Sequence, residues 1–361
     1  MKPFTGFLTV ATLALGCTGA PEAGVEEPGE AGWRLESSTQ TSGTDALLQA
    51  VSPVDAQVVW VSGHDGTYAR TADGGRTWSA AVMAGEETLQ FRDVAAFDES
   101  TAYLMSSGSG DQSRIYRTDD GGGTWRLQYV ADHPEAFLDC LDFWNPERGL
   151  AFGDVVDGVP FILSTSDGGG TWTRVPAEAL PPAQEGEGGF AASGTCLVAG
   201  SDGRAWIAAG NAERSRVLLT SDWGASWSIA EVPVVGGTGA GLTTIQVMAD
   251  GNGVALGGII GGDSLRVDNV TLTTDHGVSW SLGGRLAMAG PAYGSALVDL
   301  PSGAAAAVAV GPRGMDWSPD AGVSWRGADT LTYWAVAFAD SGAGWAVGPD
   351  GRIVRLAFVQ R

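Results

Sequence analysis

Lysine is almost absent from this sequence, because Lys2 is the single one among 20 basic residues, and histidine occurs only three times. The acidic residues number 42, so the 361-residue chain carries a formal net charge of −22. A field of this sign repels phosphate backbones and argues against nucleic-acid binding. The excess charge suits basic partners or cations, or it serves solubility alone.

Long apolar runs are also missing. The first one, residues 4–15, follows Lys2 and is too short to span a bilayer, as expected for a signal peptide over residues 1–17. It ends in Leu-Ala-Leu-Gly-Cys17, which resembles a bacterial lipobox with Cys17 as the acylated residue, although Ala14 stands where leucine is usual. Ordinary signal-peptidase cleavage remains the alternative. Residues 18–32, rich in Gly, Pro, Ala and Glu, predict a flexible tether.

These features predict an exported chain. It is either lipid-anchored to the cell envelope, with the outer membrane as one destination, or periplasmic or secreted. We expect contact with a membrane only through the lipid.

A repeated motif, S/T-x-D-x-G-x-T/S-W, is the strongest signal in the sequence. It is the Asp box, or BNR repeat, and it occurs six times at spacings of 47, 47, 55, 53 and 45 residues. The motif aspartates are Asp73, Asp120, Asp167, Asp222, Asp275 and Asp320, and the motif tryptophans are Trp78, Trp125, Trp172, Trp227, Trp280 and Trp325.

The chemistry of the motif predicts a hairpin turn. Its carboxylate can accept hydrogen bonds from the N–H groups of its own turn, its glycine permits a positive φ, and its tryptophan buries apolar surface. We therefore interpret the six aspartates as structural residues.

Each motif lies in a unit of four strand-like runs, for example 91–97, 101–106, 114–118 and 126–130. The sequence therefore predicts an all-β fold, a β-propeller of four-stranded antiparallel blades over residues 33–361. The C-terminal segment lacks the motif and a fourth strand, whereas Trp33 begins a run like those that follow a motif. We expect seven blades, with the N-terminal strand closing the last one; six or eight blades leave segments unexplained.

The six motifs and Trp345-Ala-Val-Gly-Pro-Asp350-Gly resemble the photosystem II stability/assembly-factor type of propeller, also described as sialidase-like. Residues 140–154 and 190–197 are similar to an exported bacterial branch of that group, often labelled oxidoreductase. The resemblance implies a non-catalytic binding or assembly scaffold, here in the cell envelope, with an unidentified protein or glycan partner. We expect a monomer.

A sialidase-like glycoside hydrolase on the same fold is the alternative function. It requires an arginine triad and a tyrosine nucleophile paired with a glutamate. Phe91-Arg92-Asp93 is the nearest arginine string, but it lacks the usual proline, and spacing favours neither Tyr293 nor Tyr333. The glycine-rich residues 236–241 do not form a dinucleotide-binding turn, so no cofactor is expected. The sequence favours a binding protein over an enzyme without deciding between them.

Cys140 and Cys196 occupy similar innermost-strand positions in consecutive units, which predicts a disulfide; two buried free thiols are the alternative. The acidic residues Asp139, Asp142, Asp154, Asp157, Glu185 and Glu187 could bind Ca²⁺, but they lack a ligand ladder, so solvated loops are favoured and no metal site is predicted. Alignment of the units places Arg92, Asp139, Thr244 and Trp334 near the axial channel as candidate partner-binding residues. The insertion at 177–189 is a second candidate.

Overall fold

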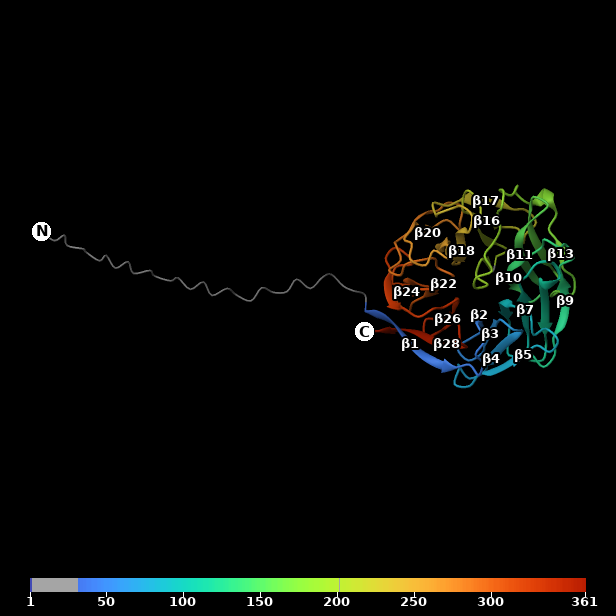
Figure 1. The fold of residues 1–361 in the computed structure, drawn as a ribbon, viewed down its shortest axis with the longest axis horizontal. Coiled ribbons are helices and arrows are strands. Elements are labelled where there is room, and N and C mark those ends of the chain that lie inside the picture. The colour runs from blue at the N-terminus through green and yellow to red at the C-terminus, as the bar shows by residue number, and fades with distance from the viewer. Residues whose placement is uncertain (2–31, 201) are drawn as a thin grey trace.

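The computed structural model describes Met1, residues 32–200 and residues 202–361. The predicted signal segment with Cys17 and the predicted tether lie outside these residues, apart from Met1 and Gly32. The described chain runs once around a ring of seven four-stranded antiparallel sheets (Figure 1). The prediction of a seven-bladed propeller is confirmed. None of the helices in the described part of the chain has the length and apolar character needed to cross a membrane.

Blades 1 to 3 follow one another along the chain, each from its inner to its outer strand. Blade 1 contains β2 (Leu48–Pro53), β3 (Val59–Gly63), β4 (Thr67–Thr71) and β5 (Ser79–Val82). Blade 2 contains β6 (Phe91–Ala96), β7 (Ala102–Ser106), β8 (Arg114–Thr118) and β9 (Arg126–Val130). Blade 3 contains β10 (Leu138–Asn145), β11 (Arg148–Val156), β12 (Val159–Thr165) and β13 (Thr173–Arg174).

Blades 4 to 6 repeat the arrangement. Blade 4 contains β14 (Leu197–Ala199), β15 (Ala205–Ala209), β16 (Arg216–Thr220) and β17 (Ser228–Glu231). Blade 5 contains β18 (Ala240–Val247), β19 (Gly253–Ile259), β20 (Val270–Thr273) and β21 (Ser281–Leu282). Blade 6 contains β22 (Gly294–Asp299), β23 (Ala305–Gly311), β24 (Gly314–Ser318) and β25 (Arg326–Asp329). Two short 3-10 helices, η1 (Gly110–Gln112) and η2 (Ala177–Ala179), lie between strands.

Blade 7 closes the ring by joining the two ends of the described propeller. Its strands β26 (Ala335–Asp340), β27 (Ala343–Val347) and β28 (Arg352–Gln360) are completed by β1 (Trp33–Thr41) as the outermost strand. β1 pairs with β28 along its whole length, from Trp33 opposite Gln360 to Thr41 opposite Arg352. This closure leaves no blade missing a strand.

The six repeat turns, defined as the motif segments between the third and fourth strands of blades 1 to 6, share one hydrogen-bond pattern. In blade 1 the Asp73 carboxylate accepts the Thr71 hydroxyl at 2.8 Å, the Thr77 N–H at 2.9 Å and the Thr77 hydroxyl at 2.7 Å. These donors lower the pKa of Asp73 to about 2. The hydroxyl-to-carboxylate bond recurs in the other five turns.

The motif glycine has a positive φ in every repeat turn, and in blade 1 it is required for a second reason. In blade 1 Gly75 has φ +83°, and a Cβ there would meet the side chain of Gln40 in β1. Gln40 Oε1 also accepts the indole N–H groups of Trp78 at 3.1 Å and Trp345 at 3.2 Å. One side chain of the closing strand therefore joins blade 7 to blade 1.

The core of the ring lies between neighbouring blades, where large apolar side chains from facing sheets interlock. Trp60, Tyr103 and Trp345 are completely buried there. The inner strands contact one another in sequence around the whole axis, and β26 returns to β2. The inner strands thus form a continuous wall around the axis.

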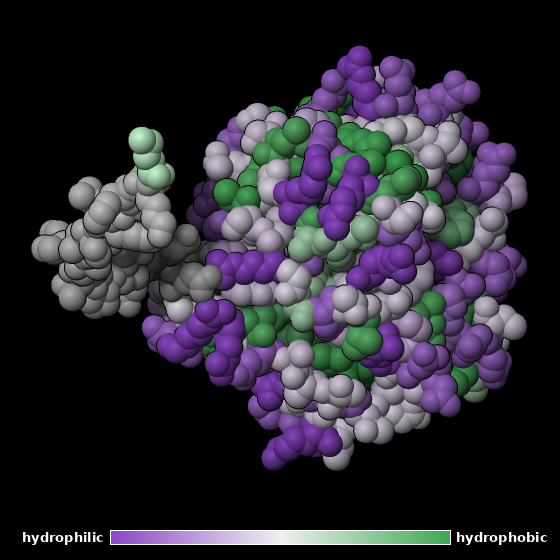
Figure 2. All heavy atoms as spheres, turned by 60° about the vertical axis from the view of Figure 1, so that its left-hand side comes forward, coloured by the Kyte–Doolittle hydropathy of each residue, from purple (hydrophilic) through white to green (hydrophobic). Residues whose placement is uncertain are grey.

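The outer surface differs from this core: Figure 2 shows apolar residues in separate patches among hydrophilic ones on the face turned to the viewer.

All seven inner strands run in the same direction, so the ring has two different ends. The connection end carries the links from the outer strand of one blade to the inner strand of the next. The turn end carries the repeat turns and the ends of the inner strands. We use these two names below.

Candidate functional site

β-bulges aim side chains of several inner strands at the axis. The antiparallel register shifts by one residue in β2, β6, β10 and β18, at Gln49, Arg92, Asp139 and Thr243. A bulge leaves its extra residue without a partner on the neighbouring strand and re-aims its side chain. In three of these blades the extra residue, Gln49, Arg92 or Asp139, contacts the loop that occupies the channel, whereas Thr243 donates to Ala292 O beside blade 6.

A loop from the link between blades 3 and 4 enters the channel at this level. We name residues 187–196 the plug. It starts between blades 3 and 4 and reaches the far side of the ring, where Gln49 Nε2 of blade 1 donates to Ala191 O at 2.9 Å and Ser193 Oγ donates to Tyr293 O, directly before blade 6, at 2.7 Å. Ala191 and Ala192 are only 6% exposed. The plug therefore crosses the axis and fills the channel with backbone.

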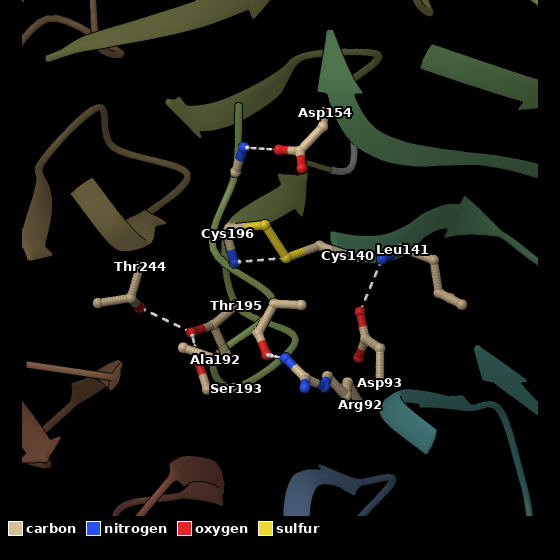
Figure 3. The surroundings of a disulfide bond; sticks show 12 residues. Arg92, Asp93, Cys140, Leu141, Asp154, Ala192, Ser193, Thr195, Cys196 and Thr244 are labelled. Atoms are coloured by element: carbon tan, nitrogen blue, oxygen red, sulfur yellow. Dashed lines mark hydrogen bonds between the residues drawn. A yellow bond between two sulfur atoms is a disulfide. The ribbon is translucent and has the colours of Figure 1, made fainter. Parts of the chain in front are cut away.

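A disulfide fastens the end of the plug to blade 3 (Figure 3). It joins Cys140 in β10 to Cys196, one residue before β14, and both sulfurs are buried. The Cys196 N–H also donates to Cys140 Sγ at 3.1 Å. From the other side, Thr195 Oγ1 donates to Thr244 Oγ1 at 2.7 Å. The plug is thus held by blades 3 and 5 at once.

Three carboxylates press against glycines of the plug. Asp154 Oδ1 accepts the Gly189 N–H at 3.2 Å, and the Asp139 carboxylate faces the same N–H. A Cβ at Gly188 would lie 1.9 Å from Asp154 Oδ1, and one at Gly194 would lie 2.2 Å from an oxygen of Asp93. Only glycine therefore lets the backbone approach these carboxylates.

The same carboxylates hold protons more tightly than usual. Burial, together with the neighbouring charge of Asp154, raises the pKa of Asp139 well above its ordinary value, against the opposing effect of Arg92. Burial raises the pKa of Asp154 to about 6, and Asp139 Oδ2 has no hydrogen bond of good geometry. Because both carboxyls face the same Gly189 N–H, they cannot both ionise without cost, which favours one shared proton.

Aspartate side chains of two inner strands also accept hydrogen bonds from backbone N–H groups of the next blade. Asp93 Oδ2 accepts the Leu141 N–H at 2.6 Å, and Asp142 Oδ2 accepts the Ala199 N–H at 2.8 Å. Burial raises the pKa of Asp93 well above its usual value and that of Asp142 to about 6. These bonds satisfy N–H groups that an inner strand would otherwise leave without partners at its open edge.

The connection end of the channel combines a guanidinium with two aromatic rings. Arg92 donates to Gln90 Oε1 at 2.5 Å and to Ala191 O at 3.3 Å, and burial lowers its pKa. Tyr293 and Trp334 each precede an inner strand, and their ring centroids lie 4.8 Å apart. All of these side chains except Ala191 are partly exposed. This surface, with Arg92, Tyr293 and Trp334 around the buried plug, is the candidate functional site.

The turn end of the channel holds a cavity of about 300 Å³ with the plug as its floor. Its floor is made by Ser193, Gly194 and Thr195, and its walls come from the far halves of the inner strands. The plug therefore divides the axial channel into two separate ends.

The sequence-predicted residues reach the channel in part. Arg92 bonds the plug, Asp139 faces it, Thr244 bonds Thr195, and Trp334 stacks on Tyr293. The residue equivalent to Arg92 and Asp139 in blade 5 is Thr243, one position before Thr244, and it donates to Ala292 O at 2.6 Å. The offset arises because a bulge adds a residue that motif spacing does not record.

The insertion at 177–189 is built into the ring. It contains η2, and Glu187 forms an ion pair with Arg216 in which both side chains are 6% exposed or less. The remaining acidic candidates take different partners: Asp157 lies beside His133, and Glu185 is exposed. The described residues contain no group of three or more His, Cys, Asp or Glu residues placed to hold a metal ion.

Several residues of the site were not identified from the sequence. Gln49 bonds the plug and also accepts or donates to His64 Nε2 at 2.8 Å, and Asp93 and Asp154 contact plug glycines. The run of small residues at 191–195 was the sequence signal available for the plug, because it lacks the alternating pattern of a strand. The tyrosine candidates also differ in surroundings: Tyr333 is 1% exposed and donates to Asp329 Oδ2 at 2.8 Å.

Together the ring and its plugged channel define the class of this protein: a seven-bladed β-propeller with a polar, disulfide-fastened axial site. No protein-family model matches the sequence, and no curated protein sequence matches it. Among solved structures, the chain is similar to YCF48 bound to a D1 peptide (TM-score 0.61, 16% identity, 90% of this chain and 94% of that chain covered). It is equally similar to YCF48 from Cyanidioschyzon merolae (TM-score 0.60, 16% identity, 91% and 99% covered).

The WD40 propeller domain of Doa1 is a further structural neighbour, with a TM-score of 0.58, 16% identity, and 91% and 98% of the two chains covered. At 16% sequence identity, the structural similarity establishes a shared fold. It leaves the role of the axial site to the chemistry of its own residues.

Proposed function

We propose that this protein is an exported, assembly-factor-like scaffold that binds an extended segment of a partner protein at the connection end of the ring. The observation that carries the proposal is the partly exposed group of Arg92, Tyr293 and Trp334 around a rigid, buried plug. A guanidinium selects a carboxylate, and paired aromatic rings offer a large apolar contact at low entropic cost. We therefore infer a segment that combines an acidic group with an apolar side chain.

The structural neighbours support a peptide as the partner. One of them, YCF48, has been solved with a D1 peptide bound, so a propeller of this shape accommodates a protein segment. A rigid ring with loops gathered at one end of a channel is also a common platform for such binding.

Two features support the proposed location: the disulfide and the lipobox-like run near the N-terminus. A buried disulfide persists in an oxidising compartment, which agrees with export. The lipobox-like run before Cys17 supports lipid attachment to the cell envelope, with plain signal cleavage as the alternative. Liquid chromatography–mass spectrometry of the N-terminal peptide of the mature protein distinguishes a diacylated Cys17 from a cleaved, unmodified terminus.

The hydrolase alternative needs a tyrosine nucleophile next to a glutamate. Among the described residues, the tyrosine that hydrogen-bonds a glutamate is Tyr116, which donates to Glu86 Oε1 at 2.6 Å. Burial and this bond raise the pKa of Tyr116 to about 12, which opposes nucleophilic attack. Tyr116 lies in β8, the third strand of blade 2, and not on an inner strand. The scaffold is therefore the function that we propose.

Panning of the purified full chain against a phage-displayed peptide library tests the proposal. We expect enriched peptides with an acidic residue near an aromatic or aliphatic one, and at least tenfold weaker binding by Arg92→Glu and Trp334→Ala. Arg126→Glu, an exposed change in β9 of the same blade, is the matched control and keeps full affinity. Peptides that bind all three variants equally would contradict the assignment of the site.

A further inference from the structure

The gap between blades 3 and 4 departs from a pattern set by the preceding blades. At the turn end, an arginine on the third strand of one blade covers the repeat turn of the next. Arg70 of blade 1 donates to Glu99 O at 2.8 Å, with its guanidinium about 3 Å from where a Cβ of Gly121 would lie. Arg117 of blade 2 donates to Gly168 O at 2.8 Å. Each arginine fills the space beside a turn glycine.

Both positions change between blades 3 and 4. Ser164 stands in β12 where Arg70 and Arg117 stand in their strands, directly before the motif threonine. Trp223 stands in the repeat turn of blade 4 where Gly121 and Gly168 stand in theirs. A short hydroxyl side chain has replaced a long cation, and an indole has replaced a hydrogen atom.

Trp223 is held in a conformation that its side chain does not favour. Its φ is 63°, in the left-handed region where a bulky residue is an outlier. The equivalent glycines have φ between 68° and 73°, so glycine meets the backbone requirement without strain. The indole is nevertheless 39% exposed. Strain that holds a large aromatic ring at the surface points to a binding role.

A hollow of about 210 Å³ remains beside this indole. The rings of Trp144 and Trp223 meet edge to face at 5.4 Å, and the Arg148 guanidinium lies 5.1 Å from the Trp223 ring centroid. Serine and threonine residues make up the rest of the lining, including Ser164, Thr171 and Thr173. The lining contains no carboxylate. Its size suits one pyranose ring better than a drug-sized ligand.

We propose that this hollow, at the turn end between blades 3 and 4, binds a sugar unit of a neutral oligosaccharide. The axial C–H groups of a pyranose pack on an indole ring, since that ring is apolar with an electron-rich face. The threonine and serine hydroxyls both donate and accept, as sugar hydroxyls require. Arg148 adds a forked donor for a vicinal pair of sugar oxygens. The site lies at the opposite end of the ring from the proposed peptide site and operates independently of it.

Titration of the purified full chain with maltotriose, cellotriose and chitotriose tests the proposal, with tryptophan fluorescence and saturation-transfer NMR as readouts. We expect at least one trisaccharide to bind with a dissociation constant on the order of 1 mM. Trp223→Gly restores the turn residue of blades 1 to 3 and relieves its strain, so it should weaken binding at least about tenfold without lowering the melting temperature. Ser164→Arg restores the covering arginine and should also block the site.

His276→Gly, at the same positive-φ position of the blade 5 turn, is the matched control and leaves sugar affinity unchanged. The proposal is overturned if none of the three sugars binds at about 10 mM, or if Trp223→Gly binds like the wild type. Binding of decaproline that Ser164→Arg abolishes, with no sugar bound, overturns it in favour of a proline-rich peptide. A lower melting temperature for Trp223→Gly, with sugar affinity kept, would show a purely structural tryptophan.

Discussion

At the scale of single residues, the molecule uses aspartate in two opposite ways. The repeat-turn aspartates are exposed or half-buried, accept several short hydrogen bonds and have lowered pKa values, as at Asp73 and Asp275. The channel aspartates are buried, as at Asp93 and Asp139, or half-buried, as at Asp142 and Asp154, and have raised pKa values. The first kind stabilises the fold when ionised and the second when protonated, so the two respond to pH with opposite signs.

Stability should therefore depend on pH through Asp142. Its folded pKa of about 6 exceeds the unfolded value of about 4, so its stabilising contribution is complete below pH 4 and is lost as the pH rises through 6. Asp142→Asn stays neutral and can still accept the Ala199 N–H. We expect chemical denaturation at pH 5 and 7.5 to show a fall in wild-type stability that is smaller by about 1.4 kcal/mol in the variant.

Asp73→Asn gives the contrasting control. The pKa of Asp73 is lowered to about 2, so its contribution is present above pH 4 and is lost only in acid. This variant should keep the wild-type change between pH 5 and 7.5. An identical pH response in the wild type and in Asp142→Asn would show that Asp142 ionises freely in the folded state.

The sequence predicted only some of the residues that contact the plug in the channel. Arg92 and Asp139 were identified because each occupies the same place in its repeat unit. Gln49 was not, since its contact reaches the plug across the ring and leaves no local pattern, and Asp154 was considered only as a Ca²⁺ ligand. Thr244 also contacts the plug, while the bulge residue of its strand is Thr243, because the register of a bulge is fixed by strand pairing, which spacing alone does not report.

At the scale of elements, the plug is the part of the fold that the repeats do not explain. It has no alternating pattern, and its position depends on side chains from blades 1, 2, 3 and 5 and on the Tyr293 carbonyl beside blade 6. By contrast, the predicted strands of blade 2 at 91–97, 101–106, 114–118 and 126–130 agree with β6 to β9 within one residue. Local alternation determines strands, whereas a loop inside a channel is placed by distant contacts.

The disulfide should contribute strongly to holding this element. It closes a chain segment of 56 residues, for which the loss of unfolded-state entropy corresponds to about 4 kcal/mol. We expect the double variant Cys140→Ser, Cys196→Ser to lose about 2–4 kcal/mol of unfolding free energy. Hydrogen exchange should rise in residues 187–196 before it rises in β18 or β22. Equal protection of the plug in both proteins would show that hydrogen bonds alone hold it.

At the scale of the whole molecule, ring closure is the defining feature, and the sequence predicted it. The final unit lacks a repeat turn and Trp33 begins a lone strand, so only a shared blade accounts for both. Blade count and closure were therefore readable from the motifs. The plugged channel was not, because motif counting describes the blades and not the space that they enclose.

Gln40 offers a direct test of the contact between the closing strand and blade 1. Gln40→Ala leaves the indole N–H groups of Trp78 and Trp345 without their acceptor and should cost about 2–3 kcal/mol in urea denaturation. Gln128 covers Gly169 in a similar way, but its Oε1 has no partner. Gln128→Ala should therefore cost less than about 1 kcal/mol. Equal losses in the two variants would show that closure rests on β1–β28 pairing alone.

The pairing of β1 with β28 also sets an order of events during folding. β1 precedes the other strands of the described propeller and its partner β28 follows them, so the edge of β1 stays without hydrogen bonds while the six intervening blades form. Joining segments about 310 residues apart is entropically slow, which makes closure the late step of folding. A circular permutant that links Arg361 to Gly32 and opens before Leu48 would make blade 7 contiguous and remove that delay.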